Sequence, residues 1–294
     1  MKIKDSLGVK IFQVINTIVL SLLCVATLYP LWHVFMASFS NGNDLQAHTG
    51  LLLYPLRANV EAFKLVFEDG QIFRAFGNSV YICVVSLALG MIITTLSAYV
   101  LTRKEFLLKG FMMKAILVTM YFGGGLIPSY LVVQTLGMYN TYWALIIPGV
   151  LGTYNMIVLR AALLAIPDSL YEAARIDGAG HFRILTQIMV PLAKATLAVI
   201  ALYILVGHWN SWFGASIYIE DAEKYPLQLF LRNTIIKNDT TAMVGDIGLG
   251  EETSAVSEAL KYAIIVVSTV PILCVYPFLQ KYFAKGVMVG AVKG

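Results

Sequence analysis

The chain of 294 residues is 59% hydrophobic and 13% charged, and its formal net charge is +4 at pH 7. A water-soluble domain of this length cannot bury so much apolar surface, so the composition excludes a soluble globular protein and indicates an integral membrane protein. The small positive charge predicts no nucleic-acid partner, because the basic residues gather between apolar segments in the way that sets membrane topology.

Six apolar segments follow one another along the chain, and each reaches the roughly 20 residues that a helix needs to cross about 30 Å of hydrocarbon. None shows the two-residue alternation of a lipid-facing β-barrel, and helices satisfy their own backbone hydrogen bonds in lipid. We therefore predict an all-α polytopic membrane protein with six transmembrane helices, in which residues 1–294 form a single transmembrane domain. The predicted spans are 11–36, 78–102, 111–133, 141–165, 192–216 and 261–283.

The first span, 11–36, is longer than the apolar region of about 7–15 residues in a cleavable signal peptide, so we expect it to be retained as an anchor. The positive-inside rule then places both chain ends in the cytoplasm. With this orientation 14 of the 21 Lys and Arg residues lie inside, and 12 of the 17 acidic residues lie outside. The links 37–77 and 217–260 become external loops, and residues 166–191 become a cytoplasmic loop.

The second external loop, 217–260, carries eight acidic residues against three basic ones. This charge favours a surface that meets a partner outside the membrane. The three cysteines lie within predicted spans, far apart and odd in number, so we interpret them as packing residues and predict neither a disulfide nor a metal site. They are Cys24, Cys83 and Cys274.

The cytoplasmic loop holds the pattern that says most about function. Ser169 and Glu172 have the S-x-x-E spacing of a capping box, so a helix is predicted to start at Ser169 with Glu172 folded back onto its backbone. Gly178 and Gly180 are predicted to end this helix, because glycine accepts the left-handed conformation of a helix stop.

A second helix over 183–190 is predicted to lead to Pro191 at the start of the fifth span. Two short helices joined by glycines form a stiff projection that can transmit a push. On the first helix, the three-and-four spacing places four residues on or beside one face, where small side chains let another backbone approach closely. These residues are Leu170, Ala173, Ala174 and Asp177.

The spacing of Glu172-Ala173-Ala174, Gly178, Ile188 and Pro191 resembles the EAA loop of ATP-binding-cassette importer permeases, with Val190 where the family usually has Leu. The likeness extends over nearly the whole chain and is closest to the sugar-importer branch, in its smaller maltose-permease type. The further segments that carry it are Gly124–Pro128, Asn140–Leu145, Trp209-Asn210, Tyr225–Gln228 and the tail Lys285–Gly294.

The resemblance implies the type I importer permease fold and a place in the cytoplasmic membrane of a bacterium. It implies four kinds of partner: a second homologous permease subunit, two cytoplasmic ATPase subunits, an extracytoplasmic solute-binding protein and membrane lipid. ATP and Mg would be bound by the ATPases, so no cofactor is expected on this chain. Residues 286–294 would touch the ATPases. The residues expected to couple to them are Leu170, Glu172, Ala173, Ala174, Asp177, Gly178, Ile188 and Pro191.

The same resemblance implies that the second external loop reaches the binding protein and that the substrate is an oligosaccharide. The expected contacts with the binding protein are Tyr225, Pro226, Leu227 and Gln228. Sugars stack on aromatic faces and bond to amide groups, and five residues at or near span interiors offer this chemistry. They are Tyr154, Asn155, Trp209, Asn210 and Trp212. Packing between helices, or anchoring at the membrane interface, explains each of them equally well.

Other function classes fit the sequence less well. A secondary transporter normally keeps ionisable groups within the membrane, and the six predicted spans contain no Asp or Glu. An enzyme is disfavoured because the chain has no H-E-x-x-H, no G-x-S-x-G and no G-x-x-x-x-G-K-[ST] motif, so ATP hydrolysis is expected on separate subunits. A permease of the same class for a non-sugar solute stays open as an alternative.

Overall fold

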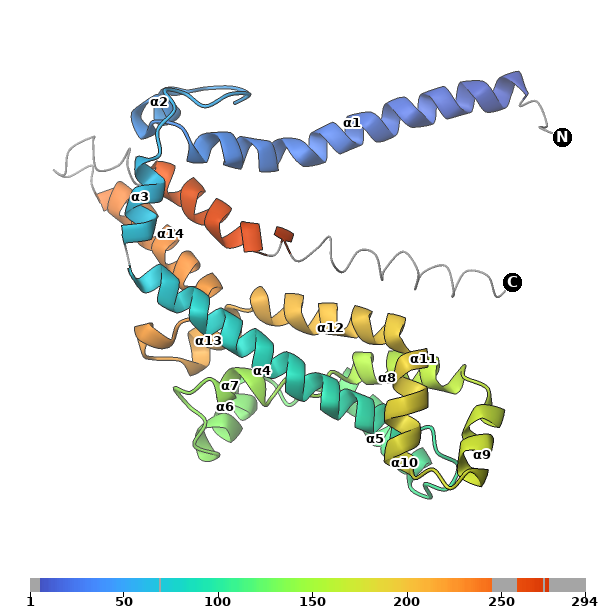
Figure 1. The fold of residues 1–294 in the computed structure, drawn as a ribbon. Helices are drawn as coiled ribbons and strands as arrows, with labels where there is room; N and C mark the ends of the chain where they lie inside the picture. The colour runs from blue at the N-terminus through green and yellow to red at the C-terminus, as the bar shows by residue number, and fades with distance from the viewer. Residues whose placement is uncertain (1–5, 69, 245–257, 272, 275–294) are drawn as a thin grey trace. The chain divides into compact units, whose positions relative to one another are not determined.

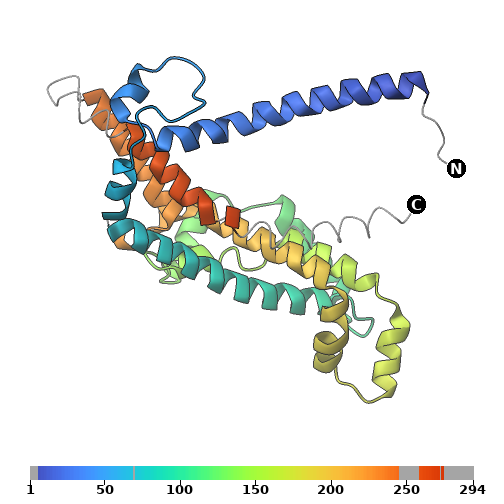
Figure 2. The same ribbon diagram turned by 45° about the horizontal axis from the view of Figure 1, so that its top comes forward.

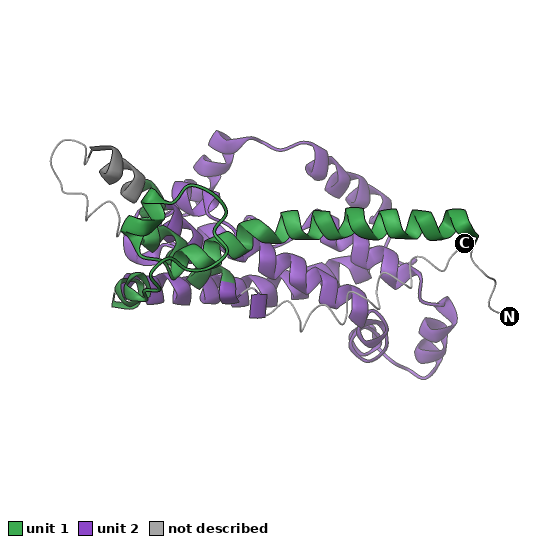
Figure 3. Ribbon diagram, turned by 90° about the horizontal axis from the view of Figure 1, so that it is seen from above, with its two compact units in different colours: residues 1–69, 233–269 green, residues 70–232, 270–294 purple. Residues whose placement is uncertain are grey.

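The computed structural model describes residues 6–68, 70–244, 258–271 and 273–274 (Figure 1). These residues form helices joined by turns, and no β-strand occurs among them, which confirms the predicted all-α class. The chain divides into two compact units (Figure 3). Unit 1 contains residues 1–69 and 233–269, and unit 2 contains residues 70–232 and 270–294.

Unit 1 begins with α1 (Leu7–Ser38), a helix of 32 residues whose length and apolar composition suit a membrane crossing. Two short helices follow it, α2 (Gly42–Ala47) and α3 (Glu61–Glu68). The unit also contains the greater part of α14 (Leu227–Val244) and the helical residues 258–269.

The segment that follows α2 lies beside the last turns of α1 (Figure 2). The Tyr29 hydroxyl accepts a hydrogen bond from the Leu52 N–H at 2.9 Å, and the Trp32 Nε1 donates to the Leu53 carbonyl at 3.1 Å. The first predicted external loop is therefore folded onto the end of the first predicted span.

Unit 2 is built on α4 (Gly70–Val100), which packs against α8 (Thr153–Leu164) and α12 (Lys194–Trp209) (Figure 1). A Cβ at Gly90 would lie 3.1 Å from Ile204 Cδ1 and 3.4 Å from the Val150 carbonyl oxygen. Glycine there lets the backbones approach closely, as small residues do between membrane helices. One face of α4 carries such small, buried residues at every fourth position: Ser86, Gly90, Thr94 and Ala98.

The other helices of unit 2 are shorter. Several of them share one apolar core with α4, α8 and α12. The buried side chains of this core include Leu159 and Leu163 from α8, Ile200 from α12, and Ile184 and Met189 from the shorter helices. The shorter helices are α5 (Lys109–Tyr121), α6 (Leu126–Thr135), α7 (Trp143–Ile146), α9 (Asp168–Ile176), α10 (His181–Ile184), the π-helical η1 (Leu185–Met189), α11 (Val190–Leu192), α13 (Phe213–Tyr218) and the 3₁₀-helical η2 (Ala222–Lys224).

Three of the predicted spans are interrupted: 111–133, 141–165 and 192–216. In the first, α5 and α6 are bent by 116° across the glycine-rich residues 122–125. In the second, the break between α7 and α8 contains Pro148, which fixes its own φ and has no N–H to donate. In the third, residues 210–212 separate α12 from α13, and the bend of 85° between the helical run ending at Leu192 and α12 lies at the start of the span.

By length and composition, the described residues hold two helices able to cross a membrane, α1 and α4, or up to four if each bent pair counts as one span. These two helices correspond to the predicted spans 11–36 and 78–102. Of the predicted span 261–283, residues 272 and 275–283 lie outside the described residues. The described helices therefore do not confirm the topology of six spans.

Candidate functional site

Residues 168–192, here called the elbow, contain two helical parts joined by a tight turn. The first part, α9, begins at Asp168 directly after Pro167, and no side chain caps it. The prediction that Ser169 starts this helix through a capping box with Glu172 is therefore wrong. The restricted φ of Pro167 sets the start one residue earlier, and Asp168 supplies the negative charge that a helix N-terminus favours.

The end of α9 is a Schellman motif. The Ala179 N–H donates to the Ala174 carbonyl at 2.9 Å, and the Gly178 N–H donates to the Arg175 carbonyl at 3.1 Å. Gly178 has a φ of +77°, which side-chain-bearing residues rarely adopt. The prediction that Gly178 ends the helix is confirmed, whereas Gly180 has a φ of −75° and precedes α10.

The second part of the elbow starts at His181, two residues earlier than predicted, and runs to Leu192 through the π-helical turn η1. Pro191 lies inside this part, in α11, and not at the start of the fifth span. The bend follows at Ala193, and α12 begins at Lys194. The predicted helix over 183–190 therefore exists, within a longer helical run that spans residues 181–192.

The two faces of the elbow differ in what they contact. Ala174 is buried with the side chains of α10 and η1 in the core of unit 2, so it does not share the exposed face of Ala173. The most exposed large apolar side chains of the elbow are instead Ile176 at 86% and Phe182 at 74%. The sequence reasoning missed both of these residues. Of the predicted coupling residues, the exposed ones are Leu170, Glu172, Ala173, Asp177, Gly178 and Pro191, while Ile188 is half-buried.

Arg103, in the link after α4, ties the elbow to that helix. Its guanidinium carbon lies 4.8 Å from the ring centroid of Tyr99, at the end of α4, and 4.3 Å from that of Tyr171 on α9. Its Nε and Nη2 donate to the Thr102 hydroxyl at 3.0 and 2.9 Å. The Tyr99 hydroxyl and His181 Nδ1 of α10 form a hydrogen bond of 3.2 Å. We call Tyr99, Arg103, Tyr171 and His181 the Arg103 clasp.

Charged groups beside the clasp add two further contacts. Lys104 Nζ lies 2.7 Å from Asp168 Oδ2, and the Tyr171 hydroxyl donates to Glu105 Oε1 at 3.1 Å. The hydrogen bond and charge of Lys104 lower the pKa of Asp168, and those of Asp168 raise the pKa of Lys104. The backbone N–H of Glu105 and then the Tyr171 hydroxyl lower the pKa of the Glu105 carboxyl. All three groups therefore carry their charges at neutral pH.

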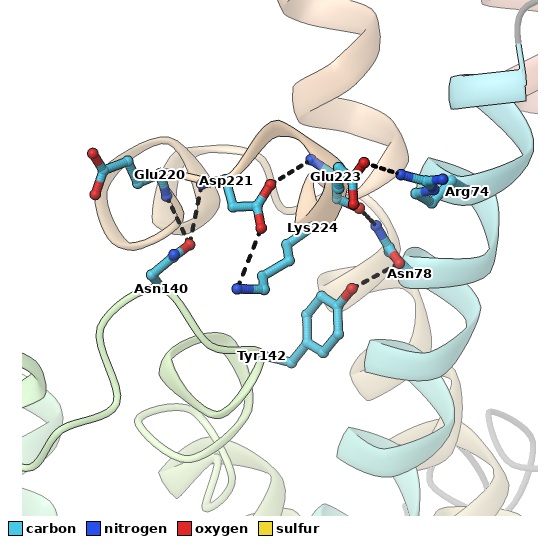
Figure 4. A network of polar contacts seen from close by, with 8 residues as sticks. All are labelled: Arg74, Asn78, Asn140, Tyr142, Glu220, Asp221, Glu223 and Lys224. Atoms are coloured by element: carbon cyan, nitrogen blue, oxygen red, sulfur yellow. Dashed lines mark hydrogen bonds and ion pairs between the residues drawn. The ribbon is translucent and has the colours of Figure 1, made fainter.

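A second polar network lies at the other end of α4 (Figure 4). Asn78 Nδ2 donates to the carbonyls of Glu223 and Tyr225 at 2.8 and 3.1 Å, and its Oδ1 accepts from the Tyr142 hydroxyl at 2.8 Å. Arg74 Nη1 forms an ion pair with Glu223 Oε1 at 2.6 Å.

Asn140 holds the beginning of the same segment (Figure 4). Its φ is +57°, and its side-chain oxygen accepts from the backbone N–H groups of Glu220 and Asp221 at 3.2 and 3.1 Å. The Leu227 N–H donates to the Ser79 hydroxyl at 2.8 Å. Residues 218–227 are thus fixed to α4 and to the link before α7 by side-chain hydrogen bonds, and we call them the anchored segment.

The predicted contacts with a binding protein lie at the end of the anchored segment. Pro226 and Leu227 are buried within unit 2, and Tyr225 and Gln228 are half-buried. The exposed part of the segment is its acidic middle, which includes Glu220 and Glu223.

The five candidate path residues lie near one end of α8 and of α12. Tyr154 is exposed and Asn155 half-buried in the first turn of α8, and Asn210 is exposed just after α12. The Trp209 ring meets Phe76 edge to face at 5.8 Å, and its Nε1 is buried with no hydrogen-bond partner among the described residues. The ring of Trp212 is covered by the guanidinium of Arg232 at 4.0 Å.

Comparison with protein families gives one match over most of the chain. Residues 90–289 match the model described as "Binding-protein-dependent transport system inner membrane component". Protein LplC of Bacillus subtilis (strain 168) is 37% identical over 285 residues, which cover 97% of this chain and 96% of LplC.

A second curated relative and a solved structure are similar over most of their length. The polygalacturonan/rhamnogalacturonan transport system permease protein YtcP of Bacillus subtilis (strain 168) is 36% identical, covering 93% of this chain and 94% of YtcP. A chain from the crystal structure of a bacterial ABC transporter involved in the import of the acidic polysaccharide alginate is 29% identical. It superposes with a TM-score of 0.86 over 96% of this chain and 100% of that chain.

Proposed function

The chain belongs to the family of binding-protein-dependent transport system inner membrane components, and we propose that it is one permease subunit of an ATP-driven importer for an oligosaccharide. A second, homologous permease forms the other half of the translocation path. Two cytoplasmic ATPases supply the energy, and an extracytoplasmic binding protein delivers the substrate. Within this family the chain is a transport permease and not an enzyme.

The proposed topology has six membrane spans with both chain ends in the cytoplasm, within one transmembrane domain over residues 1–294. The distribution of Lys and Arg along the sequence supports this orientation. In this proposed orientation the elbow lies inside the cell and the anchored segment lies outside. The interrupted spans are compatible with crossing, because broken helices occur in transporters where the freed backbone groups face protein or a water-filled path.

The elbow carries the proposal that this chain couples to the ATPases. The Schellman motif fixes the end of α9, and Ala174 packs into the core of unit 2. On the same helix Ile176 is exposed one turn away from Glu172 and Ala173, and Phe182 is exposed on α10. Exposed apolar side chains next to charged ones are typical of a surface that binds another protein. ATP and Mg are then bound by the ATPases, with no cofactor on this chain.

The substrate class follows from the names of the relatives. These name polygalacturonan and rhamnogalacturonan for one relative and the acidic polysaccharide alginate for another. Uptake assays should therefore begin with fragments of these three polysaccharides.

The proposal can be tested with the importer reconstituted in liposomes together with its binding protein. Glu172→Lys reverses a charge on the exposed face of the elbow, so we expect ATP hydrolysis stimulated by the binding protein to fall by about tenfold or more. The amount of ATPase that copurifies with the permease should fall with it. Glu220→Lys makes the same charge change at the opposite end of unit 2 and serves as the control for copurification.

Two results would count against this function. One is a Glu172→Lys importer with unchanged copurification and unchanged stimulated hydrolysis. The other is a wild-type importer that hydrolyses ATP but transports none of the carbohydrate fragments while it transports a non-sugar solute, which would favour the other substrate class.

A further inference from the structure

The two networks of unit 2 lie at opposite ends of one helix. At its beginning, Asn78 binds two carbonyls of the anchored segment, and Ser79 accepts a hydrogen bond from the Leu227 N–H. Arg74 adds an ion pair to Glu223, as Figure 4 shows. Three side chains on two adjacent turns of α4 thus hold the anchored segment.

The other end of α4 holds the elbow. Tyr99 in the last turn is hydrogen-bonded to His181, and the backbone then passes directly to Arg103, whose guanidinium covers the ring of Tyr171. The link is itself fixed, because Arg160 Nε of α8 donates to the Leu101 carbonyl at 3.1 Å. Both helical parts of the elbow therefore contact the residues that end α4.

The helix between these ends is suited to move as one body. Among the described residues of unit 2, α4 is the one unbroken helix that is long and apolar enough to cross a membrane, and its 31 residues include no proline. At 1.5 Å per residue it measures about 46 Å. Its buried face packs closely on α12 at Gly90, whereas the other described candidate spans of this unit bend or break.

We infer that α4 links the external anchored segment to the elbow, with Asn78 and Arg103 as the positioning residues at its two ends. A binding protein that pushes on the anchored segment displaces α4, and the Arg103 clasp passes this displacement to α9 and α10. The inference rests on the proposed function, which places the two ends of α4 on opposite sides of the membrane. Neither residue needs to touch substrate, binding protein or ATPase.

A double-mutant cycle in the reconstituted importer tests this link. The measured quantity is the ratio of ATP hydrolysis with and without added binding protein, compared for wild type, Asn78→Ala, Arg103→Ala and the double variant. We expect each single substitution to lower the ratio by about tenfold, because both side chains are half-buried and each makes several polar or cation–π contacts that alanine removes. Because either break interrupts the same connection, the double variant should also lose about tenfold and not about a hundredfold.

Residues this far apart normally contribute independently, so multiplication of the two losses would overturn the inference, as would unchanged ratios in the single variants. Gly77→Ala is the control on α4, because a Cβ there meets no atom within 4 Å. It should keep the ratio within about twofold of wild type.

Only variants that copurify with all partner subunits enter the cycle. Asn78→Asp and Arg103→Lys replace any alanine variant that fails to assemble, since Asp still accepts from Tyr142 but cannot donate to the two carbonyls. Lys keeps a positive charge but lacks the planar donor group of Arg. Glu172→Lys separates the two proposals. If it lowers the ratio while the losses of the two single variants multiply in the double variant, only the role of α4 fails. If it leaves the ratio unchanged, the coupling function of the elbow fails.

Discussion

At the residue scale, Gly178 and Gly180 form a natural pair for comparison. Both lie in the turn of the elbow, and a Cβ at either position would meet no atom within 4 Å. They differ in backbone conformation, because φ is +77° at Gly178 and −75° at Gly180. The requirement for glycine at position 178 is therefore conformational and not steric.

We predict that Gly178→Ala destabilises the folded turn by about 1–2 kcal/mol, whereas Gly180→Ala changes it little. Hydrogen exchange at the Gly178 and Ala179 amides, which close the Schellman motif, measures this difference directly. ATP hydrolysis stimulated by the binding protein should fall in the first variant only. Equal exchange in the two variants would mean that the left-handed turn does not hold the elbow.

The ion pair of Lys104 and Asp168 sets an expectation for pH. The lowered pKa of Asp168 means that this pair stabilises the elbow above the ordinary carboxyl pKa of about 3.9 and is lost as pH falls through the lowered value. The raised pKa of Lys104 means that the pair persists at least up to the ordinary amine pKa of about 10.4. No loss is expected between pH 6 and pH 9.

A nitroxide label on Ile176→Cys can report this stability, because that side chain is exposed. Asp168→Asn should raise the mobility of the label by the same amount at pH 6 and at pH 9, and the difference from wild type should shrink in high salt. A mobility difference that changes between these two pH values would show that this ion pair does not control the mobility of the elbow.

At the scale of elements, the packing of α4 on α12 depends on the space at Gly90. Gly90→Ala would place Cβ 3.1 Å from Ile204 Cδ1, and Ile204→Val removes that atom. We predict that Gly90→Ala lowers stability by about 1 kcal/mol or more relative to Gly77→Ala, and that the loss is smaller in the Ile204→Val background. Thermal unfolding midpoints in detergent measure both effects, and an equal loss in the two backgrounds would contradict the close approach.

The sequence predicted the elements whose signals are local. Apolar length predicted α1 and α4, and the glycine signal predicted the end of α9, because these features depend on a few neighbouring residues. The start of α9 was misplaced by one residue, since Pro167 and Asp168 outweighed the capping-box spacing of Ser169. Hydropathy also treated residues 111–133 as one span across the bend at 122–125, because it measures composition and not helix direction.

The contacts that hold the site could not be predicted in the same way. Arg103 and Tyr171 are 68 positions apart, and Asn78 and Tyr225 are 147 positions apart. No local pattern connects such pairs. In the sequence, Arg103 is only a charged residue after the predicted span 78–102, and Asn78 is only a polar residue at its start. Only the packing of α4 against the rest of unit 2 brings them to their partners.

At the scale of the whole molecule, the proposed orientation predicts which surfaces a membrane-impermeant maleimide can reach. In a variant without Cys24, Cys83 and Cys274, Ala222→Cys in η2 should react in intact cells, and Ala173→Cys in α9 should react only after the membrane is opened. Both side chains are exposed, so burial within the chain would not explain a failure to react. Labelling of Ala173→Cys in intact cells would overturn the orientation.

Ala173 and Ala174 are neighbours in the elbow, but different contacts limit the size of the side chain at each position. Ala174 is 8% exposed and packs inside its own subunit, so a larger residue there disturbs the fold whether or not any other protein is present. Ala173 faces outward, and its size can be limited only by whatever docks on that face. Substitutions at both sites can be screened first for folding of the isolated subunit and then for growth on the transported sugar. The two screens distinguish substitutions that disturb the fold from those that disturb docking of another protein. Variants at position 173 that fold but do not support growth would show that this position lies in the docking surface.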